Sequence, residues 1–406
     1  KSCKRLFSVP GHAYWFRWSP DGRRLRFTVV DRETQAKSIW EVSAAGSRPH
    51  RLFPKFRYEQ CCGSWTANGK YFVFQVHAGS TFQIWARRES GSFWFQINET
   101  PVALTDGPMS YRGPLPSKDG RKLFVRTQNP RGELVRYDPA SKQFITLLPS
   151  VPVRTAAFSK DGKWIAYTTL TNNTLWRCRP DGSDCLQLTE PMRRAVLPRW
   201  SPDGKTIAFM GRRAGHDWGV FTVGADGENL HSPCAADRDY GEPDWSPDGQ
   251  RLVFGNEMAP LNKVALYVLD LHTCGMTKLP ESTGYFTPRW SPDGRFIVAN
   301  HSGDRGLDIF EWTSRKWEQL TSMPSGDPNW SRDGKYVYFL SKKNGERGVF
   351  RISVRGRKVN EVASLASVEE GPFFLSNWFG LTPDGSPMTV RNLTTDDIYS
   401  WDFGPK

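Results

Sequence analysis

Residues 200–209 read Trp-Ser-Pro-Asp-Gly-Lys-Thr-Ile-Ala-Phe: an aromatic residue, a polar turn and an alternating apolar strand. Pro at the first central position and Gly after Asp suit a tight turn between antiparallel strands. Similar stretches begin at Trp18, Trp245, Trp290 and Trp330. Weaker copies, which lack the Trp, the Pro or the Asp, begin at Trp65, Leu115, Phe158 and Leu381. The chain therefore repeats one turn and strand along its whole length.

The repeat has a period that fits four strands. The turn glycines are Gly22, Gly69, Gly120, Gly162, Gly204, Gly249, Gly294, Gly334 and Gly385, which lie 40 to 51 residues apart. Each interval holds about four strands of five or six residues with their turns. Period-two alternation, as in residues 219–223 and 265–269, predicts antiparallel strands. Repeats of this length predict a propeller or solenoid, so we expect an all-β protein of four-stranded blades.

The two ends of the chain suggest how such a propeller closes. The ninth copy ends with its third strand near Ile398-Tyr399, and the chain begins with a separate strand that contains Leu6-Phe7. We expect these segments to pair, so that residues 4–8 complete the C-terminal blade. Residues 1–406 would then form one domain, a single closed ring of nine blades. The alternative is eight blades, with the weakest copy as a cap or insertion.

Charge and composition limit the class of partner. Lys and Arg number 55 against 42 Asp and Glu, a net charge of +13, which favours an acidic partner. The basic residues near the turns recur in most copies, so nucleic acid is not an expected partner. No run of 18 apolar residues occurs, and we expect no membrane segment in this chain. We also expect a monomer.

Seven cysteines invite a search for disulfides. Cys178 and Cys185 flank a hairpin turn symmetrically and should face each other across the strand pair. A bond there would contribute about 2–3 kcal/mol. The alternative is a metal clip, although no second ligand pair lies nearby. The pairing of the others stays open, and their odd number leaves at least one thiol free or paired outside the chain. These are Cys3, Cys61, Cys62, Cys234 and Cys274.

The phrase Trp-Ser-Pro-Asp-Gly-x-x-Ile-x-Phe resembles the repeat of TolB-type propellers, a WD40-like family of bacterial periplasmic proteins with PDG repeats. The resemblance extends over essentially the whole chain, with full matches at Trp18, Trp200, Trp245 and Trp290. Residues 175–182 and 380–399 are also similar to sensor propellers of bacterial membrane-anchored winged-helix regulators. The resemblance implies a periplasmic or otherwise extracytoplasmic protein that binds a protein or peptide and carries out no reaction.

Candidate binding residues are those expected at the channel face, where loops enter the innermost strand of each blade. Residues directly before the repeat Trp should approach the channel wall, and Tyr residues of the entry loops join them. The candidates are Arg17, Tyr58, Arg199, Tyr240, Asp244, Tyr285, Arg289 and Asn329. Arg can meet a carboxylate with two hydrogen bonds, which favours an acidic peptide or envelope glycan. Alternatively, Asp244 neutralises these Arg residues and the aromatic rings only pack.

An enzyme is the second class considered. Some propellers with related repeats are metal-dependent polysaccharide lyases with histidine ligands. His77, His216 and His301 are expected in loops on the channel face, but in three different blades. The Gly-x-Ser-x-Gly pattern of an α/β-hydrolase partner domain does not occur. We therefore expect no catalytic residue, no metal site and no cofactor, with the lyase as the alternative.

Overall fold

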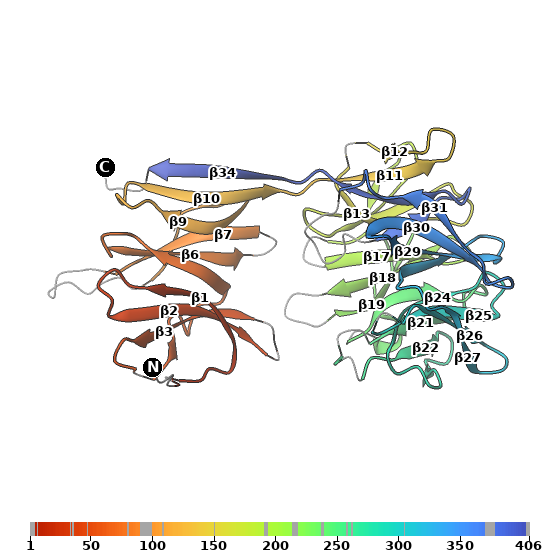
Figure 1. Ribbon diagram of the computed structural model, residues 1–406, viewed down its shortest axis with the longest axis horizontal. Coiled ribbons are helices and arrows are strands. Elements are labelled where there is room, and N and C mark those ends of the chain that lie inside the picture. Colours follow the sequence, from red (N-terminus) through yellow and green to blue (C-terminus); the bar gives the residue numbers. More distant parts are fainter. Residues whose placement is uncertain are drawn as a thin grey trace. The chain divides into compact units, whose positions relative to one another are not determined.

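The computed structural model describes residues 5, 7–32, 34, 36–46, 48–78, 81–89, 100–107, 109–149, 151–190, 194–212, 218–236, 239–256, 259–260, 263–303, 305–369 and 378–402. Strands of these residues form nine antiparallel sheets, seven with four strands and two with three (Figure 1). The all-β class predicted from the sequence is confirmed. Contacts divide the chain into two compact units: Lys1–Asn129 with Thr394–Lys406, and Pro130–Leu393.

The first unit holds three sheets. One consists of β1 (Gly11–Trp18), β2 (Arg24–Asp31), β3 (Lys37–Ser43) and β4 (His50–Arg51). The next consists of β5 (Glu59–Trp65), β6 (Tyr71–Ala78), β7 (Thr81–Arg88) and β8 (Val102–Ala103). The third is ordered β34-β10-β9, from β9 (Ser110–Pro116), β10 (Lys122–Asn129) and β34 (Thr395–Asp402).

The second unit holds six sheets. In five of them the strands follow the chain order. The first two consist of β13 (Val153–Phe158), β14 (Ile165–Thr169), β15 (Leu175–Cys178) and β16 (Leu186–Gln187), and of β17 (Arg194–Trp200), β18 (Thr206–Arg212) and β19 (Trp218–Gly224). The other three consist of β20 (Gly241–Trp245), β21 (Arg251–Gly255), β22 (Leu266–Asp270) and β23 (Met276–Lys278); of β24 (Tyr285–Trp290), β25 (Phe296–His301), β26 (Leu307–Glu311) and β27 (Lys316–Thr321); and of β28 (Gly326–Trp330), β29 (Tyr336–Lys343), β30 (Glu346–Ser353) and β31 (Val359–Ser364). The sixth is ordered β12-β11-β33-β32, from β11 (Gly132–Asp138), β12 (Gln143–Leu148), β32 (Phe379–Leu381) and β33 (Pro387–Asn392). A short 3-10 helix, Pro233–Ala235, follows β19.

The third and ninth copies of the repeat exchange their outer strands. β10 pairs with β34 instead of with β11, the next strand in the chain. In turn, β11 pairs with β33, so the segments on either side of residues 130–131 and 393–394 belong to different units. Antiparallel backbone hydrogen bonds are the same whichever strand supplies them, and the residue pattern of a strand does not name its neighbour.

The strand pairing corrects the predicted closure. Of residues 4–8, Arg5, Phe7 and Ser8 belong to no strand, while Lys4 and Leu6 lie outside the described residues. Phe7 stacks on Phe27 of β2, with ring centroids 5.6 Å apart, and β34 pairs with β10. In the second unit, the inner strands β13, β17, β20, β24, β28 and β32 contact one another in order, and β32 also contacts β13. This cycle of six differs from the single ring of nine blades, or of eight, that the repeats suggested.

Within the second unit, neighbouring sheets are joined by apolar side chains of their middle strands. Phe209, Phe254, Phe310 and Phe339 are fully buried on β18, β21, β26 and β29. The clusters around them combine residues of neighbouring sheets, such as Leu175 of β15 with Phe209 of β18. Burying a large apolar side chain contributes about 1.5–3 kcal/mol. This packing fixes the inner strand of each sheet in place. Side chains of the inner strands can therefore contribute to a binding site.

Candidate functional site

Four inner strands of the second unit share a bulge three residues before the repeat Trp. Leu197, Glu242, Thr287 and Asp327 lie where the register of β17, β20, β24 and β28 shifts. Their φ angles are 54°, 53°, 52° and 46°, in the left-handed region. Because a bulge bends its strand and redirects a side chain, each blade can turn one residue toward a common space.

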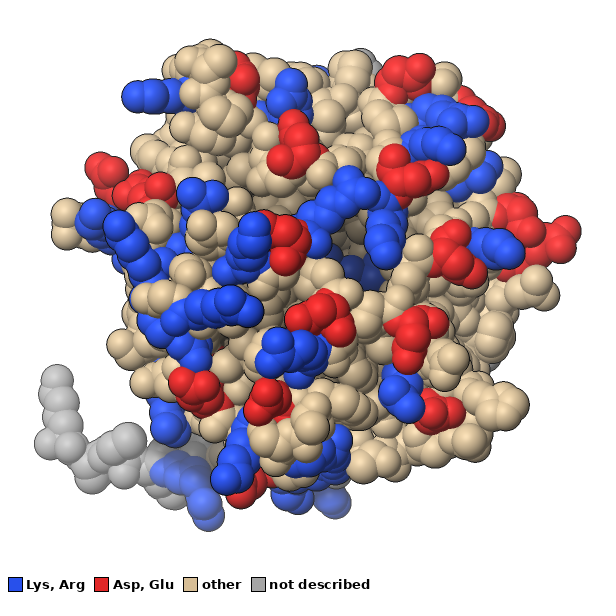
Figure 2. All heavy atoms as spheres, turned by 90° about the vertical axis from the view of Figure 1, so that its right-hand side faces the viewer, with Lys and Arg blue, Asp and Glu red and all other residues tan. Residues whose placement is uncertain are grey.

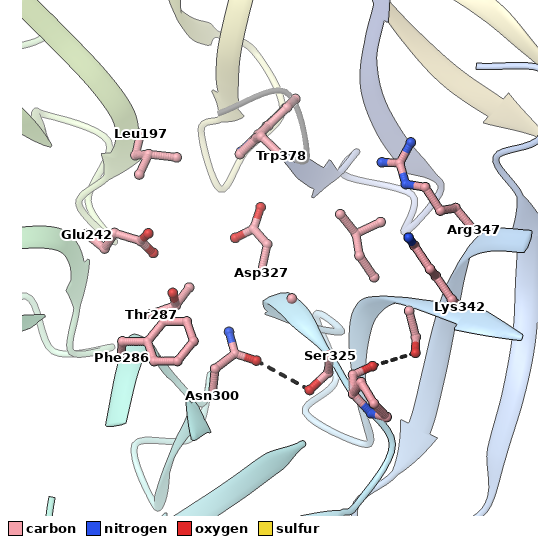
Figure 3. A pocket seen from close by; sticks show the side chains of 14 residues that line it. Leu197, Glu242, Phe286, Thr287, Asn300, Ser325, Asp327, Lys342, Arg347 and Trp378 are labelled. Atoms are coloured by element: carbon pink, nitrogen blue, oxygen red, sulfur yellow. Dashed lines mark hydrogen bonds between the residues drawn. The ribbon is translucent and has the colours of Figure 1, made fainter. Parts of the chain in front are cut away.

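These four bulge residues line a pocket of about 630 Å³. Trp378, Phe286 and Leu340 add apolar surface, and Lys342 and Arg347 contribute basic side chains from β29 and β30. Figure 3 shows the carboxylates of Glu242, on β20, and Asp327, on β28, directed into the pocket from two different blades. The rest of the lining is Asn300, Pro324, Ser325, Gly326 and Ser341. A mostly apolar cavity with a few converging polar groups is typical of a ligand site.

Arg289 joins the two carboxylates below this pocket. Its side chain is 3% exposed, and Nη2 donates to Glu242 Oε2 at 3.2 Å and to Asp327 Oδ1 at 3.1 Å. Nη1 donates to the carbonyl oxygen of Pro288 at 2.8 Å. Burial raises the pKa of Asp327, an effect that the charges of Arg289 and Arg199 oppose. Arg289 is therefore held by internal acceptors and not presented to an external carboxylate.

Arg199 occupies the same repeat position on β17, whose sheet is separated from that of Arg289 by the sheet of β20. Nη1 donates to Asn329 Oδ1 at 3.4 Å, and Nη2 lies 3.9 Å from Asp327 Oδ1. Burial, followed by the charge of Arg289, lowers the pKa of Arg199 to about 10. Asn329 donates to the backbone carbonyls of Asp327 and Phe379. The hydrogen bonds of Arg199 and Asn329 thus support the bulge of β28.

Asp244 is the third predicted residue at this level. Its Oδ2 accepts a hydrogen bond from the backbone N–H of Trp290 at 2.7 Å. Burial raises the pKa of Asp244, while Arg199 and Arg289 act in the opposite direction. Arg289 forms its direct ion pairs with Glu242 and Asp327. Its charge is therefore neutralised internally, but chiefly by these two carboxylates and not by Asp244, which the sequence suggested.

Two of the predicted tyrosines pack within the blades. Tyr285 is 7% exposed, stacks on Trp317 with centroids 4.0 Å apart, and donates to Asp308 Oδ2 at 2.5 Å. Burial, more than that hydrogen bond, raises the pKa of the Tyr285 hydroxyl. Tyr240 contacts the rings of Phe254 and Tyr267. Neither tyrosine lines the pocket.

Arg17 and Tyr58 belong to the first unit, apart from the six other predicted residues. The Arg17 guanidinium lies 4.6 Å from the ring centroid of Trp15, and its Nη1 donates to the carbonyl oxygen of Phe16. Tyr58 receives a hydrogen bond from Arg57 and lies near Trp85. Their role as ligand contacts stays a prediction.

The sequence interpretation missed the position three residues before the repeat aromatic residue. It chose the position directly before that residue, which lies one layer deeper in the blade. The signal is weak, because the bulge residues are chemically diverse: Trp15, Cys62, Gly113, Leu197, Glu242, Thr287 and Asp327. Only Gly commonly adopts positive φ without cost, so the pattern of residue types gives little warning of a left-handed residue.

The described histidines do not form a shared site. His77 stacks on Phe82 in the first unit, and His301 contacts Tyr285 in the second; His216 lies outside the described residues. Among the residues that the structure describes, no group of three or more His, Cys, Asp or Glu side chains is placed to hold a metal ion. The site accordingly offers hydrogen bonds, charge and apolar surface as its means of recognition.

The described part of the chain contains three disulfides. Cys178 and Cys185 are joined, the pair that the hairpin suggested. Cys234 is joined to Cys274 across 40 residues, and the neighbours Cys61 and Cys62 are joined to each other. Cys3 lies outside the described residues.

Comparison with known proteins supports one fold. A TolB from Agrobacterium tumefaciens matches 65% of this chain and 99% of its own, with a TM-score of 0.55 and 18% identity. The fold is that of a TolB-type β-propeller. The Tol-Pal system protein TolB of Francisella tularensis is 27% identical over 70 residues, which are 17% of this chain and only 14% of that protein. An oligogalacturonate lyase in complex with manganese reaches a TM-score of 0.37 at 13% identity, too low to support an inference. No family model matches the chain.

One face of the second unit carries mixed charge (Figure 2). Figure 2 shows one face of the second unit, hollowed near its centre, with Lys and Arg around the hollow and Asp and Glu among them. Such a mixture does not provide the continuous basic surface that a polyanion needs. The helical segments in the described ranges include none long and apolar enough to cross a membrane.

Proposed function

We propose that this TolB-like chain is a non-catalytic binding or sensor propeller, and that its second unit recognises a segment of a protein or peptide. The observation that supports this most directly is the pocket of about 630 Å³ built by bulge residues of successive blades. Apolar walls and a few directed charges suit an extended peptide better than a flat protein surface.

The partner is proposed to carry an acidic group. Arg289 and Arg199 engage internal carboxylates, so this part of the proposal rests on Lys342 at the pocket wall. Lys342 is exposed at the end of β29, where its ammonium group can turn toward a ligand. The net charge of +13 would assist the approach of such a partner.

An extracytoplasmic, periplasmic setting is also proposed. Three disulfides in one chain are typical of oxidising compartments. This agrees with the resemblance of the repeats to a periplasmic family.

Binding can be tested with a pool of random octapeptides passed over the immobilised protein and quantified by mass spectrometry. We expect Lys342→Glu to reduce retention of acidic peptides about fivefold, because it reverses a charge at the pocket wall. The matched control is Lys343→Glu, at an exposed neighbour that does not line the pocket. Equal retention by native and heat-unfolded protein, or equal effects of the two variants, would contradict the proposal.

A further inference from the structure

Asn300 brings a buried hydrogen-bond donor to the pocket. The residue is 1% exposed on β25, and its Oδ1 accepts from Ser325 Oγ at 3.3 Å. Its Nδ2 has no hydrogen-bond partner among the described residues. Figure 3 shows this amide nitrogen directed into the pocket, toward the region of Asp327. A buried donor without an acceptor is costly, so this position favours a ligand that supplies an oxygen atom.

Two carboxylates near Asn300 keep part of their surface open to the pocket. Two guanidinium groups, those of Arg199 and Arg289, face three carboxylates, those of Glu242, Asp244 and Asp327. The side chains of Glu242 and Asp327 remain 15% and 14% exposed at the pocket. A cation that binds at the exposed oxygen atoms of Glu242 and Asp327 would also lie beside the Asn300 donor.

We infer that the pocket binds the free N-terminus of a peptide segment, with the α-ammonium group at Glu242 and Asp327 and the first carbonyl oxygen at Asn300 Nδ2. The inference rests on the proposed function and names the part of the peptide that enters. An N-terminus carries an ammonium group and a carbonyl oxygen on adjacent carbon atoms, whereas the ammonium group of a Lys side chain has no such neighbour. The first side chain would meet Phe286 and Trp378, and an acidic residue farther along would reach Lys342.

The test uses three pools of random octapeptide amides with the same composition, except for one fixed residue in the third. The first has free N-termini, the second acetylated N-termini, and the third acetylated N-termini with a fixed central Lys. We expect the wild-type protein to retain the first pool about tenfold better than the second. Glu242→Gln should remove that preference and keep side-chain volume, and Asn300→Ala should weaken it. Glu228→Gln, at an exposed acid outside the pocket, should leave it unchanged.

The outcomes separate the two proposals. Equal retention of the first two pools, with a loss in Lys342→Glu, would overturn the N-terminus inference and leave peptide binding intact. Preference for the Lys pool over the free N-termini would also overturn it. Retention of none of the pools would overturn the proposed function itself. Thermal unfolding of each variant shows whether it is folded. If Asn300→Ala is not folded, Glu242→Gln alone tests the inference.

Discussion

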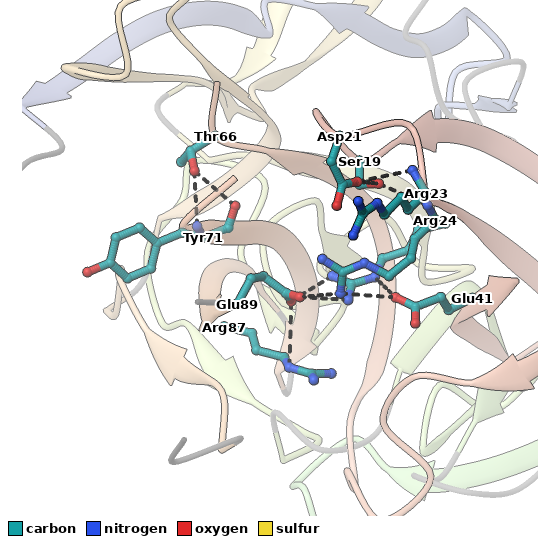
Figure 4. A network of polar contacts seen from close by, with 10 residues as sticks. Ser19, Asp21, Arg23, Arg24, Glu41, Thr66, Tyr71, Arg87 and Glu89 are labelled. Atoms are coloured by element: carbon teal, nitrogen blue, oxygen red, sulfur yellow. Dashed lines mark hydrogen bonds and ion pairs between the residues drawn. The ribbon is translucent and has the colours of Figure 1, made fainter. Parts of the chain in front are cut away.

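Each unit of the molecule buries an arginine between two acidic residues, and the two clusters are completed differently. In the first unit, Arg26 is 1% exposed; Nε donates to Glu41 Oε2, and Nη1 and Nη2 donate to the two oxygens of Glu89, all at 2.7–2.9 Å. Figure 4 shows Glu41 and Glu89, the two acidic residues of this cluster. Trp65 and Phe72 cover its guanidinium, with centroids 4.1 and 4.3 Å away. In the second unit, Arg289 joins Glu242 and Asp327 beneath an open pocket.

The difference teaches that the same ion pairs can serve packing or recognition, according to what covers them. Aromatic rings exclude water from Arg26, so its carboxylates are committed to arginines. Loss of Arg26 would leave Glu89 buried with only Arg24 at 3.0 Å and Arg87 at 3.6 Å. The carboxylates at Arg289 keep one side open to a cavity. They can exchange water for a ligand group, at less cost to folding. The predictions below test this contrast.

The largest effect of a single substitution is expected for Arg26→Met. Removing the guanidinium takes two hydrogen bonds from Glu89, 1% exposed, and leaves it Arg24 and Arg87 as cations, so the loss should be near the lower end of the range for a broken buried pair, about 3 kcal/mol of the free energy of unfolding. Denaturant titration combined with hydrogen exchange read peptide by peptide would assign the loss to the first unit. Arg23→Met, at an exposed turn residue, is the control and should change stability by less than about 0.5 kcal/mol. Similar losses in both variants would refute the account of the Arg26 cluster.

Disulfide removal should affect mainly the second unit. The bond between Cys234 and Cys274 closes a loop with a sequence separation of 40, and replacing both by Ser should cost about 4 kcal/mol in the chain-entropy model. The same change at Cys178 and Cys185, separated by 7, should cost about 2–3 kcal/mol. Cys61 and Cys62 are adjacent and close no loop of comparable length, so their replacement is the control in the first unit. The reverse order of losses would contradict the model.

Arg289→Met should cost less than Arg26→Met, about 1–3 kcal/mol, because water in the pocket can solvate Glu242 and Asp327 after the guanidinium is lost. The two variants, compared in the same denaturant titration, measure the contrast directly. If Arg289→Met is as destabilising as Arg26→Met, the second cluster is closed to water, and its use for ligands would be doubtful.

The turns and the strands were easier to predict from the sequence than the strand that pairs with each strand. Ser201 Oγ donates to Asp203 at 2.6 Å, and the backbone N–H of Lys205 donates to it at 3.0 Å, so the quoted phrase builds its own turn. Local contacts of this kind are encoded in five residues. The exchange of β11 and β34 is not local, since alternation fixes the face of a strand and not its partner.

Of the residues at the candidate site, the sequence predicted only those directly before the repeat aromatic residue. Arg199, Asp244, Arg289 and Asn329 do gather around one centre, as the repeat position implied. The residues that meet the pocket depend on the bulge and on loops of other strands. The donor of Asn300, on β25, has no feature in the sequence that distinguishes it from other strand residues.

The smallest effect concerns acid sensitivity of the turns, and it also separates the units. The Ser hydroxyl, followed by the backbone N–H two residues on, lowers the pKa of the turn carboxylates Asp161, Asp203 and Asp333; Asp248 and Asp384 are lowered first by their Ser or Thr hydroxyl as well. The first unit has two such residues, Asp21 and Asp119. A carboxyl with a lowered folded-state pKa stabilises the fold above its unfolded value, about 3.9, and this contribution is lost as the pH falls through the folded value.

We therefore expect the second unit to lose more stability than the first as the pH falls from about 5 to about 2, measured by hydrogen exchange within each unit. Asp203→Asn should remove part of that dependence, by at most about 1 kcal/mol, because the group is close to the surface. The fold should tolerate the change: Asn68 already occupies the equivalent turn, where it accepts from Thr66 Oγ1 at 2.8 Å and from the N–H of Lys70 at 3.0 Å. Since Asn does not titrate, the variant and the wild type should converge in acid. Curves that stay parallel over this range would show that the turn carboxylates do not set the acid stability of either unit.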